Sequence, residues 1–525
     1  MMTRPHSVVM ALLLLAEVSR FGEGASNPGF VVRITERGLE YARQYGMAIL
    51  KKELSAINVP DLSGSFQAGW MGSVSYEFKW LRIRSFQIRN IDLSLLPGTG
   101  VRASLSNNYV SIQGNWKVKK AFVTLEGTFD LSMDGISILI HLNLGKDWSG
   151  RPTASVAHCS NSIGHVSIHI SGHLSWVLNL FHERIENKIK DILKQEICRI
   201  VRMSTSSYLE PYLRTLPVTL MTDQVAGIDY SLVGAPRVTS QGLDTPFKGE
   251  FFSRSQRTPV PFDAPPIRLP QEHDRMVYFA ISQYVFNTAS RVYQEAGHMN
   301  FTIRNEDIQK LNMLLSNHSA QEWWNPNCLA SETTPFTTMI SCFISSYLLL
   351  LLQIPLDFPI QLHTKSLGTV IPQLSRLYPN TELELEISPE SAPLLLFTPG
   401  NVTFKPVMNI QAFALMPNSS NREPLFQLRA RTNISATVSV SSGRVLGSVT
   451  PGSKLELELK HSNIDSFNVK LLESIFNYYA SYIIFPSLNE KLEGGFPLPL
   501  PRDTYLYSVQ LQIHKNFLFI GANID

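Results

Sequence analysis

Cysteine and charge are both scarce in this sequence of 525 residues. Only 4 cysteines are present, so disulfide bonds cannot supply most of the stability and a buried hydrophobic core must do so. Charged residues make up 17% of the chain, and 46 basic residues against 43 acidic ones leave a net charge of +3. This composition excludes a disulfide-rich scaffold and bulk disorder, and the length favours two domains.

Catalytic motifs are also missing. The chain has no Gly-x-Ser-x-Gly elbow, no His-Glu-x-x-His pair, no P-loop and no Gly-x-Gly-x-x-Gly after a predicted strand. His165, His169 and His173 recur at intervals of four, but on a strand each lies about 13 Å from the next, too far to share one ion. The sequence therefore predicts a binding protein with no metal site and no enzymatic activity.

Long hydrophobic runs are rare, and one of them lies at the N-terminus. Arg4 is followed by a short apolar core over residues 8–16, and the small residues Gly22 and Gly24 precede a cleavage point before Ala25. This layout is typical of a secretory signal, and its apolar core is too short to span a bilayer. We therefore expect residues 1–24 to be a signal peptide and the mature protein to be secreted and extracellular.

A proline-rich stretch near the middle divides the chain into two halves. Residues 257–270, RTPVPFDAPPIRLP, are typical of an extended, semi-rigid linker. Each half begins with a short strand that leads into an amphipathic helix, where Thr35 or Ser282 can cap the first turn. Each half also contains a second long helix, predicted over 175–201 and 469–492, and alternating β segments lie between its two helices. Internal duplication is the simplest account, and the fold class it predicts is α+β with antiparallel sheets.

The small net charge hides an asymmetry between the halves. Residues 25–256 contain 25 basic and 19 acidic residues, whereas residues 257–525 contain 19 and 22. Eight of the basic residues fall within 71–124, which has only two acidic residues. In this stretch GNWKVKKAF, residues 114–122, alternates apolar and basic residues and then shifts phase at Lys120, which is typical of a bulge or a hairpin tip. The local positive charge predicts an anionic partner.

Several longer strings resemble one known family. They run from Asn27 to the C-terminus with one interruption, and include NPGFVVRITERGLEYA, LLPGTGVRASLSN, GNWKVKK, FDLSMDGISI, LRTLPVTL and QIHKNFLFIGAN. In these strings the chain resembles the bactericidal/permeability-increasing and lipopolysaccharide-binding family, which also includes the cholesteryl ester and phospholipid transfer proteins. YVFNTASRVYQEAG and RLYPN are most similar to the lipopolysaccharide-binding branch, and LKHSNI is more similar to the bactericidal branch.

The resemblance implies a boomerang-shaped α+β fold of two tandem barrels joined by a central antiparallel sheet. Each barrel is a twisted antiparallel sheet wrapped around a long helix. The expected parts are an N-terminal barrel at 25–220, central-sheet strands at 221–256, the linker at 257–270, a C-terminal barrel at 271–500 and strands that return to the central sheet at 501–525. Cys159 and Cys198 match the family's one disulfide, which ties a strand to the long helix.

The resemblance also implies a site at the tip of the N-terminal barrel, where the family binds the phosphorylated lipid A of bacterial endotoxin. Lysine ammonium groups attract phosphates with a strength that depends on salt. Trp116, beside the lysines, is expected at the level of the lipid headgroups. The residues predicted to bind lipopolysaccharide phosphates are Lys119 and Lys120 first, then Lys117, and Arg82 and Arg84 on a neighbouring strand.

Lipid pockets are the other feature that the resemblance implies. The family has an apolar pocket in each barrel, close to the central sheet, that holds the acyl chains of a phospholipid. Burial of acyl chains stabilises the complex by about 0.8 kcal/mol per CH₂. We expect phospholipid in two apolar pockets and no other cofactor.

One segment interrupts the resemblance. Residues 309–353 separate IRNEDI from IPLDFPIQLHTKS, two strings that are nearly contiguous in the family. A membrane-inserting element is one interpretation, but Pro335 interrupts the charge-free run and its apolar part is short for a span. We favour an atypical insertion, loosely packed on the C-terminal barrel, whose deletion leaves the fold intact. The state of Cys328 and Cys342 within it stays open.

Glycosylation sequons are confined to the second half. All Asn-x-Ser/Thr sequences lie beyond residue 299, at Asn300, Asn317, Asn401, Asn418 and Asn433. They predict an exposed, glycosylated surface there.

The sequence thus predicts a secreted lipid carrier that binds bacterial lipopolysaccharide and delivers it to a host co-receptor in innate immunity. Phospholipids and a transient bacterial outer-membrane or micelle surface are further expected partners, and nucleic acid is not. Three alternatives stay open. A bactericidal relative would show a stronger positive field, a plasma phospholipid transfer protein would keep the pockets without the tip, and a heparin-like polyanion binder would need only the basic patch.

Overall fold

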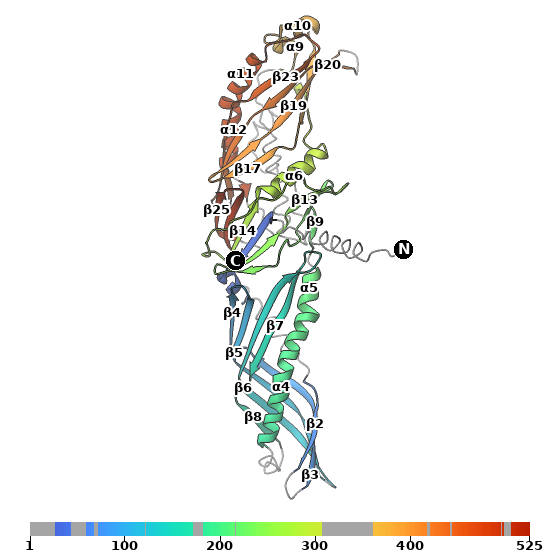
Figure 1. Ribbon diagram of the computed structural model, residues 1–525, viewed down its shortest axis with the longest axis vertical. Coiled ribbons are helices and arrows are strands. Elements are labelled where there is room, and N and C mark those ends of the chain that lie inside the picture. Colours follow the sequence, from blue (N-terminus) through green and yellow to red (C-terminus); the bar gives the residue numbers. More distant parts are fainter. Residues whose placement is uncertain are drawn as a thin grey trace, which may run out of the picture.

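Two elongated halves extend in opposite directions from a central sheet (Figure 1). This arrangement comes from a computed structural model. It describes residues 27–41, 43, 59–67, 72–120, 122–171, 182–215, 217–306, 361–416, 421–441, 444–494, 496–497 and 506–524. The signal peptide predicted at 1–24 and the insertion predicted at 309–353 lie outside the described residues.

The N-terminal half is one antiparallel sheet of seven strands beside a long helix. Its main path is β2-β3-β5-β6-β7, with β4 paired to β5 and β8 paired to β6. The strands are β2 (Leu62–Gln67), β3 (Ser73–Gln87), β4 (Asn90–Leu96), β5 (Gly100–Lys120), β6 (Val123–Lys146), β7 (Pro152–Ser162) and β8 (Val166–Ile170). Side chains of alternate residues pack toward the helix, so the sheet has a buried inner face and an exposed outer face.

The C-terminal half differs because its strands form two sheets of five. One sheet has the order β15-β16-β19-β20-β23 and the other β17-β18-β21-β22-β24. The first comprises β15 (Phe301–Ile303), β16 (Glu382–Pro389), β19 (Val407–Leu415), β20 (Arg422–Arg431) and β23 (Glu456–Ser462). The second comprises β17 (Leu394–Thr398), β18 (Asn401–Lys405), β21 (Ile434–Ser441), β22 (Arg444–Pro451) and β24 (Phe496–Pro497). Two short helices, α9 (Thr364–Leu367) and α10 (Pro372–Leu377), cover the far end.

The long helix of each half contains the same irregularity. In the N-terminal half α4 (His182–Ser204) continues through a π-helical turn (Thr205–Leu209) into α5 (Glu210–Thr215). In the C-terminal half α11 (Val469–Tyr479) continues through a π-helical turn (Ala480–Ile484) into α12 (Phe485–Gly494). The second residue after each π turn is a proline, Pro211 or Pro486, which cannot donate the regular helical hydrogen bond. The shared break lets each helix run beyond its proline, and for this reason the first helix extends past the predicted end at 201.

The central sheet has six strands in the order β11-β12-β1-β14-β26-β25. They are β11 (Arg237–Val238), β12 (Leu243–Phe247), β1 (Phe30–Ile34), β14 (Val277–Ser282), β26 (Phe517–Ile524) and β25 (Leu506–His514). The first strands of the two halves, β1 and β14, pair antiparallel at its centre, and each is flanked by the last hairpin of its own half. This order is what an internal duplication predicts.

Other elements pack around the central sheet. β9 (Thr219–Met221), β10 (Ala226–Asp229) and β13 (Glu250–Ser253) form a separate three-stranded sheet, so the predicted central strands of 221–256 are divided between two sheets. Helix α6 (Gln283–Glu295) begins at Ser282, whose hydroxyl accepts a hydrogen bond from the Tyr284 N–H, as the sequence predicted. In the linker, Ile267 and Leu269 pack against the core of the central sheet.

The predicted α+β fold of two related halves joined by a central antiparallel sheet is therefore confirmed. Within the described part of the chain, no helix is both long enough and apolar enough to cross a membrane.

Candidate functional site

The predicted tip is a tight hairpin between β5 and β6. Lys120 at the end of β5 pairs with Val123 at the start of β6, so only two residues connect the strands. Phe122 in this loop is fully exposed, and Val123 is largely exposed. The phase shift at Lys120 in the sequence is therefore the hairpin tip (Figure 1, lower end).

Lysines and carboxylates alternate on the outer face of the sheet behind this tip. Glu77 on β3 lies between two lysines, with Nζ–Oε distances of 2.9 Å to Lys79 and 3.9 Å to Lys119. Lys117 lies 3.2 Å from Glu126 on β6. The hydrogen bond from Lys79, and the positive charge of Lys79, Lys119 and Lys117, hold the pKa of Glu77 below its usual value. Glu77 is thus an ionised anchor that keeps lysine ammonium groups close together.

Arg82 and Arg84 lie farther from the tip than Lys119. Lys119 pairs with Ser75 and Arg82 pairs with Gln113, so Arg82 is six residues along the sheet, or about 20 Å. Arg84 lies 3.7 Å from Asp130 on β6. Arg82 forms no ion pair with any residue that the structure describes. Five of these cations therefore form a stripe along the outer face, here called the basic stripe: Lys79, Arg82, Arg84, Lys117 and Lys119. Lys120 lies at the hairpin tip itself, two residues after Val118 and so on the other side of the strand from Lys119.

The positive excess of this region is smaller than the sequence window suggested. The window of residues 71–124 ended at the second residue of β6, and β6 is hydrogen-bonded directly to β5. It contributes Glu126, Asp130 and Asp134, which pair with Lys117, Arg84 and Arg89. Residues 71–134 thus contain eight basic and five acidic residues, an excess of +3.

Trp116 does not lie at the surface, which corrects the prediction of an interfacial role. Its side chain is only 7% exposed, and it packs in the N-terminal core beside Phe78 and next to Gly127 on the adjacent strand. The alternation that placed Trp116 and Val118 on one face was right, but that face points inward. Its indole N–H is buried without a hydrogen-bond partner among the described residues.

The exposed aromatic side chains of this region are Phe122 and Trp80. Neither residue was predicted from the sequence as an exposed aromatic. Phe122 follows directly from the hairpin. Trp80 is exposed because a β-bulge interrupts β3 at this point, and a bulge leaves only a faint signal in the sequence.

An apolar pocket lies between the sheet and helix α4 in the N-terminal half. Every residue that lines it is apolar: Val59, Leu62, Phe78, Leu81, Ile112, Phe129, Leu131 and Leu193. It lies in the middle of the half, under β3, β5 and β6, whereas the predicted pockets lie close to the central sheet. The presence of phospholipid in two pockets stays a prediction.

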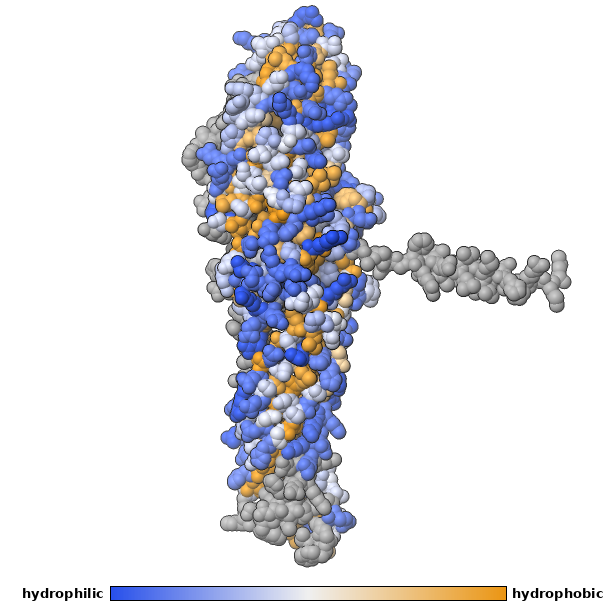
Figure 2. All heavy atoms as spheres, turned by 60° about the vertical axis from the view of Figure 1, so that its left-hand side comes forward, coloured by the Kyte–Doolittle hydropathy of each residue, from blue (hydrophilic) through white to orange (hydrophobic). Residues whose placement is uncertain are grey.

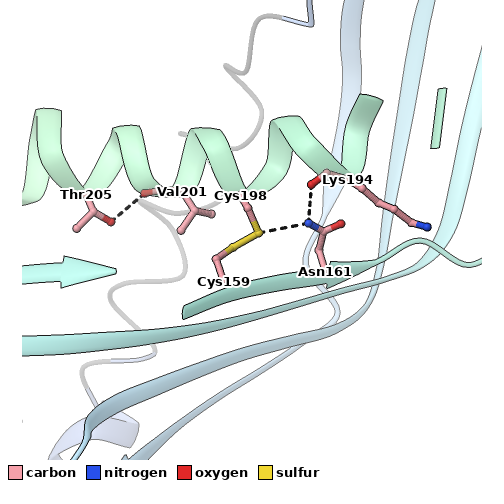
Figure 3. The surroundings of a disulfide bond; sticks show 6 residues. All are labelled: Cys159, Asn161, Lys194, Cys198, Val201 and Thr205. Atoms are coloured by element: carbon pink, nitrogen blue, oxygen red, sulfur yellow. Dashed lines mark hydrogen bonds between the residues drawn. A yellow bond between two sulfur atoms is a disulfide. The ribbon is translucent and has the colours of Figure 1, made fainter. Parts of the chain in front are cut away.

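A disulfide fixes the long helix to the sheet. Cys159 on β7 is bonded to Cys198 on α4, with a Cα–Cα distance of 5.8 Å, as the sequence predicted (Figure 3). Asn161 supports the same junction, because its amide donates to the Lys194 carbonyl at 2.8 Å and to the Cys198 sulfur at 3.3 Å. Helix α4 is therefore held against β7 at two adjacent points.

The predicted glycosylation sites lie in the C-terminal half. Asn300 is exposed, and Asn401 and Asn433 are half-buried; Asn317 and Asn418 lie outside the described residues. His165 and His169 lie before and within β8, and His173 also lies outside the described residues. In the described part of the chain, no group of three or more His, Cys, Asp or Glu side chains is placed to hold a metal ion.

An apolar interior enclosed by twisted sheets, with a basic stripe outside one half, defines a lipid-binding class of protein. Comparison with family models gives the same class. The model described as "LBP / BPI / CETP family, N-terminal domain" matches residues 38–212, and the corresponding C-terminal domain matches 221–321 and 327–525. The chain belongs to the LBP / BPI / CETP family.

Similar proteins span nearly the whole chain. The chain is 44% identical to lipopolysaccharide-binding protein of Homo sapiens over 519 residues, which cover 99% of this chain and 97% of that protein. It is 36% identical to bactericidal permeability-increasing protein of Rattus norvegicus over 515 residues, covering 98% and 97%. A crystal structure of lipopolysaccharide binding protein superposes with a TM-score of 0.53 at 38% identity and covers 95% of this chain and 99% of that one.

Proposed function

We propose that this protein is a secreted carrier that binds the lipid A of bacterial lipopolysaccharide and delivers it to a host receptor. Lys119 and Lys120 at the hairpin tip bind the phosphates, Lys117 and Lys79 support them, and acyl chains enter the apolar interior. The observation that carries this proposal is the set of lysines gathered around Glu77, directly behind the fully exposed tip. The similarity to lipopolysaccharide-binding proteins supports the choice of ligand.

Electrostatics explains how the grip forms and releases. An ammonium–phosphate hydrogen bond is charge-assisted, and at an exposed site it weakens as salt screens it. Glu77 repels a phosphate, but it also holds the lysine side chains near one another before the ligand arrives. Lysine–phosphate hydrogen bonds of this kind are strong enough to extract one lipid and weak enough to release it to a receptor. Neither step breaks a covalent bond. We infer that the protein is not an enzyme.

Phospholipid transfer is a second candidate function. The pocket between the sheet and α4 is lined only by apolar side chains, but it is about the size of one water molecule, so acyl chains would enter only if the sheet and α4 moved apart. A directly bactericidal role is less well supported, because the carboxylates of β6 reduce the positive excess around the basic stripe.

The test is to measure binding of fluorescent lipid A with and without its phosphates. Wild type should prefer the phosphorylated form, and Lys119→Ala/Lys120→Ala should lose this preference. Arg431→Ala/Lys460→Ala, which removes two cations from the C-terminal half, is the matched control and should bind as wild type does. Equal binding of both lipid forms by wild type would contradict the lipid A proposal.

A further inference from the structure

Trp80 is an unusual residue on the exposed side of β3. Its side chain is 69% exposed, and its φ is +60°, a conformation that bulky side chains rarely adopt. The carboxylate of Asp61 accepts a hydrogen bond from its backbone N–H at 2.9 Å. A strained backbone that a neighbouring side chain holds in place is typical of a functional site.

The bulge at Trp80 also decides which side of the sheet the arginines occupy. Lys79 pairs with Asn115 and Arg82 pairs with Gln113, so three steps on β3 match two steps on β5. Before the bulge odd-numbered residues of β3 such as Ser75 and Lys79 are exposed, and directly after it the exposed residues are the even-numbered Arg82 and Arg84. Without the extra residue, strict alternation would turn both arginines toward the core.

The exposed indole is therefore flanked by cations on its own strand. Lys79 precedes it, and Arg82 and Arg84 follow, with side chains that are exposed. Of these three cations, Arg82 is the one that forms no ion pair with any described residue. An aromatic ring can stack on the C–H side of a sugar ring, and a guanidinium can donate two parallel hydrogen bonds to a phosphate or carboxylate.

We propose that Trp80, Arg82 and Lys79 form a subsite for an anionic saccharide, namely the phosphate- or carboxylate-bearing sugars joined to lipid A. This inference rests on the proposed function. Trp80 lies about 15 Å along the sheet from Lys119, so sugars that extend from a tip-bound lipid A reach it within a few sugar units. On the side of this half that bears β4–β6, hydrophobic residues form a strip among hydrophilic ones (Figure 2).

The experiment uses the full chain and three probes: lipopolysaccharide that retains its inner-core sugars, lipid A without core sugars, and heparin as a sulfated host polysaccharide. Trp80→Gly removes the ring and suits the positive φ, because glycine adopts it without strain. The matched control is Trp148→Ala, which removes a 98% exposed tryptophan from the turn between β6 and β7. Trp80→Asn and Arg82→Gln are second variants, should the glycine variant fold poorly.

We expect Trp80→Gly and Arg82→Gln to weaken binding of the core-bearing probe about tenfold, the size of one lost aromatic or charged contact. Trp80→Gly should leave lipid A affinity unchanged, and Trp148→Ala should match wild type throughout. This inference fails while the proposed function stands if wild type binds both bacterial probes and Trp80→Gly gives one of three results. Its affinity for both probes equals that of wild type, its affinity for both falls equally, or only its affinity for heparin falls. If wild type binds neither bacterial probe, the proposed function itself fails.

Discussion

The two halves of the molecule hold their long helices in different ways. In the N-terminal half the Cys159–Cys198 disulfide bonds α4 to β7. In the C-terminal half two asparagine amides do this work: Asn477 exchanges two hydrogen bonds with the backbone of Leu455, and Asn489 exchanges two with the backbone of Val449. One covalent bond and a pair of reciprocal amide clamps are thus alternative solutions to the same packing problem.

The outer faces of the two halves differ as well. In the C-terminal half Arg304, Arg422, Arg429, Arg431 and Lys460 each lie within 4 Å of a carboxylate. In the N-terminal half Lys79 and Lys117 lie 2.9 and 3.2 Å from carboxylates, and Lys119 and Arg84 lie 3.9 and 3.7 Å from theirs, whereas Arg82 forms no ion pair with any residue that the structure describes. Arg422 and Arg431 bridge different strands of one C-terminal sheet, whereas the guanidinium of Arg82 has no ion-pair partner in the described part of the N-terminal half. The two halves of a duplicated frame can therefore differ in how completely their outer cations are paired.

Removal of the disulfide should have the largest effect. The bond spans a sequence separation of 39 residues. Cys159→Ser/Cys198→Ser should lower the free energy of unfolding by about 4 kcal/mol, because the unfolded chain regains the entropy of an open loop. Denaturant unfolding monitored by hydrogen exchange should show that the lost free energy of unfolding belongs to α4 and β7. An unchanged midpoint would show that Asn161 and the core hold the helix without the disulfide.

The asparagine clamp of the C-terminal half should come next. Asn489→Ala should cost about 2 kcal/mol, because the Val449 N–H and carbonyl lose their partner together. Ser474→Ala is the control, since Ser474 is exposed and its hydroxyl bonds only within its own helix. If both variants unfold at the same denaturant concentration as wild type, the clamp is not the counterpart of the disulfide.

We expect the stability of the C-terminal half to depend on pH through Glu384. Burial raises the pKa of its carboxyl, but hydrogen bonds from Arg422 and Arg304 outweigh burial and hold the pKa below its usual value. A depressed folded pKa means that this stabilisation is present above the unfolded value of about 4.3 and is lost as the pH falls through the folded value.

Glu384→Gln should therefore cost about 1 kcal/mol at pH 7, since both arginines are half-exposed and remain hydrated. Thermal unfolding of this variant should vary less than that of wild type between pH 7 and pH 3. A pH dependence equal to that of wild type would exclude Glu384 as its source.

The smallest expected effect is a gain in affinity for phosphorylated lipid A. Glu77→Gln removes the carboxylate that faces Lys79 and Lys119, so affinity for phosphorylated lipid A should rise about twofold to fivefold. The gain should shrink as salt is raised. A loss of affinity at every salt concentration would mean that Glu77 matters more as an anchor than as a competitor.

Much of the fold could be predicted because its signals are local. Alternation gave the long strands, the hydroxyls of Thr35 and Ser282 marked helix starts, and the repeated order of elements gave the duplication. What could not be predicted depends on partners across strands. The burial of Trp116 depends on which face α4 covers, and the neutralisation of Lys117 and Arg84 depends on β6. Trp80 depends on a bulge that only the register between β3 and β5 defines.

The most direct test of the central claim is transfer of fluorescent lipopolysaccharide from aggregates to a soluble receptor, with phospholipid transfer measured alongside. Wild type should transfer both lipids. Lys119→Ala/Lys120→Ala should lose lipopolysaccharide transfer and keep phospholipid transfer, because only the first needs the cationic tip. Lipopolysaccharide transfer at the wild-type rate by this variant would contradict the account.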